Sequence, residues 1–88
     1  MDKSNYLHIL GHRLAQERAR LGLTQTQVAE LAAVARRTQV NYESGERAPD
    51  ASYLELLGQQ GFDALYVLTG RREQANAAPR VTEPGSTY

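Results

Sequence analysis

Two adjacent arginines, Arg36 and Arg37, are the residues of this sequence whose types and position most clearly indicate chemistry. They open an expected helix, where the helix dipole already places partial positive charge and disfavours a cation by up to ~1 kcal/mol. The preceding Ala35 has no side chain that could cap the helix, so backbone N–H groups stay free at the same end. An anionic partner would remove both penalties, because phosphate accepts from free N–H groups and arginine pairs with guanine N7 and O6. The alternative is a pair of solvated surface charges.

Other residue types that could do chemistry lack partners. His8 and His12 are four apart and could share a helix face, but no third ligand of the right kind lies nearby and no zinc-protease pattern is present. Four serines have no convincing base partner in the sequence: Ser4, Ser44, Ser52 and Ser86. The sequence therefore predicts no enzyme, no metal site and no cofactor.

Length and composition bound the class of protein. Eighty-eight residues make one domain with a modest core, and 41% apolar with 23% charged residues is ordinary for a soluble globular protein. The lack of cysteine excludes disulfides and thiolate metal sites. Apolar runs are too short to span a membrane, and the polar Gly-His-Arg follows the first apolar residues too soon for a secretory signal. We therefore expect a cytoplasmic protein with no membrane partner.

The charge balance neither demands nor excludes a nucleic-acid partner. Ten basic and ten acidic residues give a formal net charge of zero, which is mild evidence against such a partner. The position of the charges matters more than their sum. Between Arg13 and Arg47, six arginines stand against four glutamates. This small excess predicts weak non-specific DNA affinity and leaves specificity to particular contacts.

Five helices are predicted from apolar spacing and from residues that start or stop helices. Leucines recur at helical spacing before Gly22, and Thr24 with Gln27 forms a T-x-x-Q capping box at the start of the second helix. Gly45 ends the third helix and Asp50 caps the fourth. The expected ranges are about 5–21, 25–32, 36–44, 51–61 and 62–68.

Packing expectations follow from these ranges. The second helix should bury Val28, Leu31 and Ala32, while Gly11 inside the first helix costs it ~1 kcal/mol. Beyond Gly70 the sequence RREQANAAPRVTEPGSTY is rich in small residues and proline. We therefore expect a domain over residues 1–70 and a flexible tail over 71–88.

The stretch TQTQVAELAAVARRTQVNYESG, from Thr24 to Gly45, follows L-G-L and precedes E-R-A-P-D. It resembles the helix-turn-helix of phage repressors, Cro proteins and their bacterial relatives, the XRE-type family. Ala29 matches the small residue at which the two helices touch, and the family's apolar positions are matched by Val28, Ala32, Val34 and Tyr42. The resemblance covers about four fifths of the chain. It implies an all-α, five-helix, lambda-repressor-like DNA-binding domain.

Two positions depart from the family pattern. The family often has glycine in the turn where this chain has Ala33, and an alanine with positive φ is strained. The family also usually has an apolar residue at position 39 and a polar one after it, whereas this chain has Gln39 and then Val40. Either Val40 turns inward, or Gln39 finds a buried hydrogen-bond partner. The choice sets which side of the third helix faces outward.

The resemblance also implies roles for individual residues. Arg18 and Glu43 match a structural ion pair that joins the first helix to the end of the third. Gln25 matches a phosphate contact, as do Ser44 and Arg47, and the start and middle of the third helix match base-reading positions. The implied DNA-binding set is Gln25, Thr26, Gln27, Arg36, Arg37, Thr38, Val40, Asn41, Ser44 and Arg47.

The last predicted helix is apolar at nearly every position, more than one face of a short helix can bury. It either closes the core or pairs with a second copy of the chain through Phe62, Leu65, Tyr66, Val67 and Leu68. A two-fold dimer would present two recognition helices about one DNA turn, ~34 Å, apart on a palindromic operator.

The predicted function is therefore that of a sequence-specific, double-stranded DNA-binding transcriptional regulator, a small phage-type repressor acting as a homodimer. An antitoxin that also represses its own promoter belongs to the same class. The competing class is a protein-interaction module on the same scaffold, such as an anti-repressor or anti-activator. Neutral net charge and the apolar last helix favour that alternative.

Overall fold

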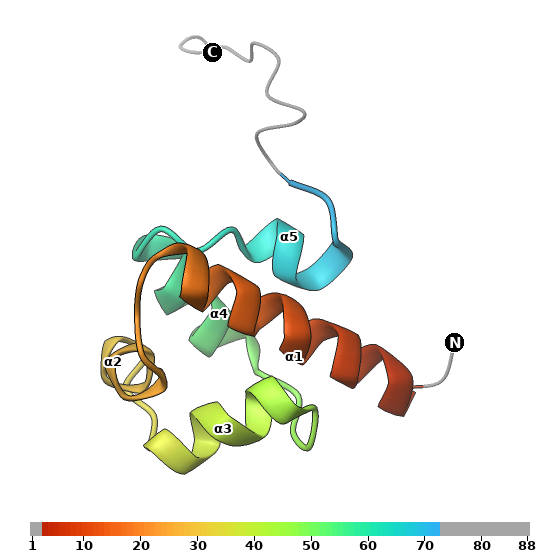
Figure 1. The fold of residues 1–88 in the computed structure, drawn as a ribbon, viewed down its shortest axis with the longest axis horizontal. Coiled ribbons are helices and arrows are strands. Elements are labelled where there is room, and N and C mark those ends of the chain that lie inside the picture. Colours follow the sequence, from red (N-terminus) through yellow and green to blue (C-terminus); the bar gives the residue numbers. More distant parts are fainter. Residues whose placement is uncertain (1–2, 73–88) are drawn as a thin grey trace, which may run out of the picture.

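Five helices make up the part of the chain that the computed structural model describes, residues 3–72 (Figure 1). They are α1 (Lys3–Arg20), α2 (Gln25–Leu31), α3 (Arg36–Ser44), α4 (Ala51–Gln59) and α5 (Ala64–Thr69). The predicted all-α, five-helix class is thus confirmed. Of the predicted tail, Arg71 and Arg72 are described, and residues 73–88 lie outside the described residues.

Side-chain caps set where three of the helices begin. Thr24 and Gln27 form the predicted capping box: the Gln27 amide donates to Thr24 Oγ1 at 3.1 Å, and the Thr24 amide donates to Gln27 Oε1 at 2.8 Å. Asp50 accepts from the Tyr53 amide at 2.9 Å at the start of α4. The predicted start of the last helix at residue 62 is wrong, because Asp63 caps α5 by accepting from the Tyr66 amide at 3.0 Å.

The core lies between α1 and the other four helices. Leu10 and Leu14 of α1 are buried with apolar residues from every other helix and from the α4–α5 connection: Val28, Ala32, Tyr42, Tyr53, Leu57, Phe62 and Val67. Leu31 is 38% exposed, so the prediction that it is buried is wrong. The inward positions of α2 are taken by Val28 and Ala29 instead.

The helix-interior Gly11 allows α1 to cross α3 at very close range. A Cβ atom at this position would lie 2.4 Å from the carbonyl oxygen of Glu43 and 2.6 Å from that of Tyr42. Both contacts are with backbone atoms, which no side-chain rotation can relieve. The glycine weakens its own helix and in return brings α1 onto the end of α3.

The turn between α2 and α3 holds Ala33 in the left-handed region, with a φ of 59°. The Val34 amide donates to the Ala29 carbonyl at 2.9 Å and the Ala33 amide to the Glu30 carbonyl at 3.2 Å, so the end of α2 is closed by backbone bonds. The turn therefore has the geometry that usually takes glycine, and the alanine is strained there.

We expect Ala33→Gly to stabilise the domain by about 0.5–1 kcal/mol. Glycine removes the strain of the positive φ, although part of this gain is lost because glycine also frees the unfolded chain. Urea unfolding should show a higher midpoint with an unchanged slope. The neighbouring Ala32→Gly is the control and should destabilise, because Ala32 has a φ of −97° and is buried. A lower midpoint for Ala33→Gly would contradict this geometry of the turn.

Candidate nucleic-acid interface

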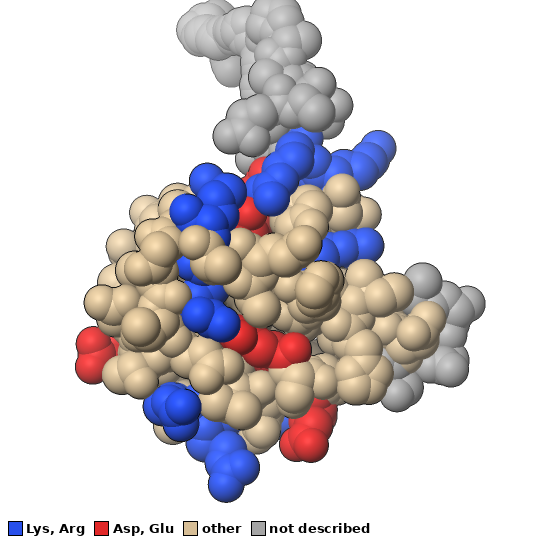
Figure 2. Space-filling view, in the orientation of Figure 1, with Lys and Arg blue, Asp and Glu red and all other residues tan. Residues whose placement is uncertain are grey.

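The start of α3 combines free backbone donors with positive charge. The N-cap residue Ala35 makes no side-chain hydrogen bond to the helix, and the first turn contains no acidic residue. Arg36 and Arg37 are exposed there. Figure 2 shows basic side chains protruding at the lower margin of the molecule, over the start of α3. This end of the helix is therefore suited to an anionic ligand.

The rotation of α3 about its axis is fixed by Gln39, which is fully buried. Tyr53 of α4 donates its hydroxyl to Gln39 Oε1 at 2.5 Å, and Gln39 Nε2 donates to Glu43 Oε2 at 2.8 Å. Burial raises the pKa of the Tyr53 phenol well above its usual range, so the hydroxyl keeps its proton. The sequence left two alternatives for Gln39 and Val40, and the structure has the one in which Gln39 finds buried hydrogen-bond partners. Val40 lies partly exposed on the other side of the helix.

Glu43 is the point at which α1, α2 and α3 are joined by polar contacts. Arg18 donates two hydrogen bonds to the Glu43 carboxylate, from Nε to Oε2 at 2.7 Å and from Nη2 to Oε1 at 3.1 Å. A third arginine nitrogen, Nη1, donates to the Leu23 carbonyl at 3.0 Å. Gln25 Nε2 also donates to Glu43 Oε1, at 3.1 Å. The ion pair is partly buried, with side-chain exposures of 23% for Arg18 and 8% for Glu43.

The implied contact residues of α2 are already used within the fold. Gln25 is bonded to Glu43 through one amide hydrogen, which leaves its second hydrogen for another acceptor. Gln27 uses its amide oxygen in the capping box, while its amide nitrogen is available. Thr26 is exposed between them. The first turn of α2 can therefore present polar donors to a backbone phosphate.

The remaining implied contacts lie along α3 and in the loop after it. Thr38 and Asn41 are half-exposed on α3. Ser44 is exposed and donates its hydroxyl to the Asn41 carbonyl at 3.2 Å. Arg47 is exposed too, with its guanidinium 5.6 Å from the centre of the Tyr42 ring. Their contacts with DNA stay a prediction.

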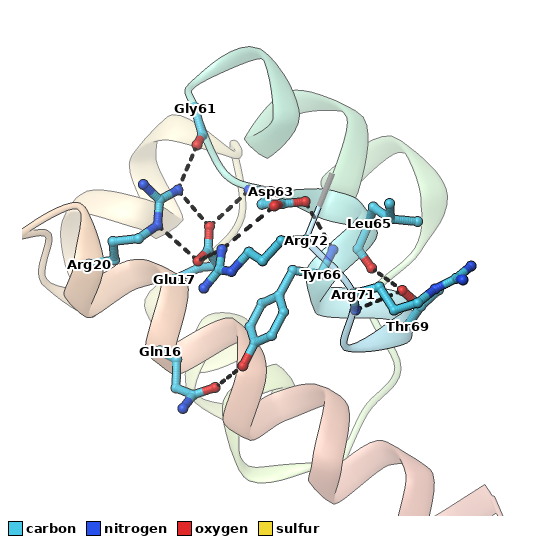
Figure 3. A network of polar contacts seen from close by, with 10 residues as sticks. All are labelled: Gln16, Glu17, Arg20, Gly61, Asp63, Leu65, Tyr66, Thr69, Arg71 and Arg72. Carbon is cyan, nitrogen blue, oxygen red and sulfur yellow. Dashed lines mark hydrogen bonds and ion pairs between the residues drawn. The ribbon is translucent and has the colours of Figure 1, made fainter. Parts of the chain in front are cut away.

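A polar cluster around Glu17, drawn in Figure 3, was not predicted from the sequence. Glu17 is fully buried and accepts from both Nε and Nη2 of Arg20, at 3.0 and 2.7 Å. The Asp63 amide donates to it at 2.9 Å and Arg72 Nη1 at 2.5 Å. Arg72 also lies 3.8 Å from the centre of the Tyr66 ring. The cluster joins α1 to the start of α5 and to the segment after it.

Glu17 is ionised in this cluster. Burial alone would raise the pKa of its carboxyl, but the hydrogen bonds from Arg20, the Asp63 amide and Arg72 outweigh burial and lower the pKa to about 2. Asp63 and Arg72 lie 46 and 55 residues from Glu17 in the sequence, so no local sequence pattern could have revealed these two partners. The cluster belongs to the scaffold and lies on the α5 side of α1.

The five residues considered for a dimer contact fall into two groups. Phe62 and Val67 are 4% and 1% exposed and belong to the core of a single molecule. Leu65 and Tyr66 are half-buried, and Leu68 is 40% exposed. The apolar segment therefore closes the core with part of its residues. A contact with a second copy stays a prediction for the accessible ones only.

Comparison with known proteins places these helices in a family. A model described as a helix-turn-helix domain, representing XRE-like domains, matches residues 9–59, more than half of the chain. The match contains all of α2, α3 and α4. No curated protein matches the chain. Among the described residues, no helix is long and apolar enough to cross a membrane. The family indicates a DNA-binding regulator. The chain belongs to the XRE-like helix-turn-helix family, as the stretch from Thr24 to Gly45 indicated.

Proposed function

We propose that the protein is a sequence-specific regulator of transcription that places α3 in the major groove of double-stranded DNA. The observation that carries the proposal is the start of this helix, where Ala35 provides no cap and Arg36 and Arg37 are exposed. A helix selected for stability alone would favour a capping side chain and acidic residues at this end. DNA supplies both a phosphate acceptor for the free N–H groups and guanine edges for the arginines.

The other implied contacts fit a docking in which phosphates position the domain and α3 reads bases. Gln25, Thr26 and Gln27 at the start of α2 would meet one phosphate group, and Ser44 and Arg47 another. The outward residues of α3 would face base edges between them. The Glu43 contacts with Arg18, Gln25 and Gln39 would hold the two helices in the required orientation.

Binding as a homodimer would place two α3 helices about one DNA turn, ~34 Å, apart on a palindromic operator. The accessible apolar residues Leu65 and Leu68 of α5 are the proposed contact surface. Repression would then follow from blocking access of RNA polymerase to the promoter.

Selection from a random pool of duplexes, followed by gel-shift titration at two salt concentrations, tests the proposal. A regulator of this type should select a palindromic site and lose affinity steeply as salt rises. Sedimentation of the complex should show two protein chains for each duplex. If no sequence is selected, the repressor hypothesis fails, and the protein-interaction module becomes the better explanation.

We expect Arg36→Ala or Arg37→Ala to weaken binding to the selected site by about 1–3 kcal/mol and to relax the preference at one base pair. This follows if the arginine pairs with guanine in the major groove. Gel shifts on the selected site and on single-base variants measure both effects. Arg71→Ala removes an exposed arginine just after α5, the helix on the other side of α1 from α3 (Figure 1), and should leave binding unchanged. Equal weakening on all sequences would instead identify a phosphate contact.

A further inference from the structure

Val40 is an apolar side chain in the middle of the outward face of α3. Arg36, Val40 and Ser44 are four residues apart, and Arg37 and Asn41 have the same spacing, so the five form one stripe on the helix surface. The opposite side of the helix carries the buried residues Gln39 and Tyr42. The apolar side chain of Val40 thus lies among the charged and polar side chains of this stripe.

Stability of the fold does not account for this valine. Val40 is partly exposed, and it is not among the partly buried apolar residues packed against the core, which are Tyr6, Leu21, Leu23, Val34 and Leu54. A β-branched residue is also a poorer helix former than alanine or most long polar residues. The side chain therefore brings little to the isolated domain at this position.

The hydrogen bonds of the buried Gln39 keep Val40 facing outward. Gln39 is held by the Tyr53 hydroxyl on one side and by the Glu43 carboxylate on the other, at 2.5 and 2.8 Å. Turning α3 so that Val40 pointed inward would break both bonds and expose Tyr42. The outward position is thus a fixed property of the fold.

In the major groove, the one apolar group that a base pair presents is the C5-methyl group of thymine. We propose that Val40 reads this methyl group, so that each half-site carries a T·A pair beside the base pair contacted by Arg36 or Arg37. The two arginines lie one helical turn before Val40, which puts their contacts on neighbouring base pairs. This inference rests on the proposed function and adds the chemistry of one recognised base.

Deoxyuridine tests the proposal, because it differs from thymidine only by the missing methyl group and keeps every hydrogen-bonding atom. Each thymine of the selected site is replaced in turn, and binding of the full chain is measured by gel shift. Wild-type protein should lose about fourfold in affinity at one position of each half-site, the value of one buried methyl group. Val40→Ala should bind the thymine site more weakly and lose this response at that position. Circular dichroism should show that the variant keeps its helices.

The control Leu31→Ala removes a larger exposed apolar side chain from α2 and should keep the wild-type response to deoxyuridine. The inference is overturned if the wild-type protein selects a site but responds to deoxyuridine at no position. It is overturned equally if Val40→Ala keeps the same response. In both cases the proposed function stands, because a site has been selected. Failure to select any site removes the proposed function and this inference together.

Discussion

Gly11→Ala is expected to destabilise the domain by about 3 kcal/mol, although alanine is the better helix former by ~1 kcal/mol. The added Cβ atom would lie 2.4 Å from the Glu43 carbonyl oxygen and 2.6 Å from that of Tyr42. Since these are backbone atoms of α3, the whole helix has to move away from α1. Urea unfolding of the two proteins measures the loss.

Gly58→Ala is the matched control for this prediction. Gly58 lies inside α4, and a Cβ atom added there would meet nothing within 4 Å. The same substitution should therefore stabilise the domain by up to about 1 kcal/mol. Opposite signs for the two variants would show that the close crossing of α1 and α3 dominates at Gly11. Stabilisation by both would contradict the crossing.

The second large effect concerns Glu17. Glu17→Gln should cost about 3 kcal/mol at neutral pH, because Arg20 and Arg72 lose the charge of their common partner. The pKa of this carboxyl is about 2 in the fold, against an ordinary value of 4.5. The stabilisation is therefore complete above pH 4.5 and is lost as the pH falls towards 2.

Urea unfolding between pH 7 and pH 3 tests this pH dependence. The difference in unfolding free energy between wild type and Glu17→Gln should be largest at pH 7 and should shrink as the solution is acidified. Glu30→Gln replaces an exposed glutamate of α2 and should differ little from wild type throughout. A difference that stays constant with pH would show that Glu17 does not titrate below its ordinary range.

Local signals in the sequence were enough to predict much of the fold. The Thr24–Gln27 capping box predicted the start of α2, and Gly45 predicted the end of α3, because caps act within a few residues. The order of Gln39 and Val40 left two alternatives open, and the sequence could not choose between them because the buried partner of Gln39, Tyr53, comes from another helix. The outward orientation of Val40 could be inferred only from the structure, which shows this hydrogen bond.

Contacts between distant segments were beyond the same reasoning. Gly11 counted as a cost to its helix, since nothing nearby in the sequence shows that the α3 backbone lies against it. Glu17 counted only as negative charge beside the arginines, whereas the family resemblance had already paired Glu43 with Arg18. Glu17 is bonded to two arginines and is fully buried, while Glu43 is bonded to Arg18 and two glutamines and is only 8% exposed. The formal net charge of the sequence therefore includes two carboxylates, Glu17 and Glu43, that are hardly exposed at the surface.

Arg72 gives the domain a fixed attachment point for protein engineering. Its guanidinium is held by Glu17 and lies over the Tyr66 ring, on the side of α1 away from α3 (Figures 1 and 3). A fluorescent reporter or surface anchor fused directly after this residue would start from a defined place on the domain. This place lies on the side of α1 away from α3, so that a label attached there would leave the proposed DNA-binding helix uncovered in immobilised or single-molecule binding measurements.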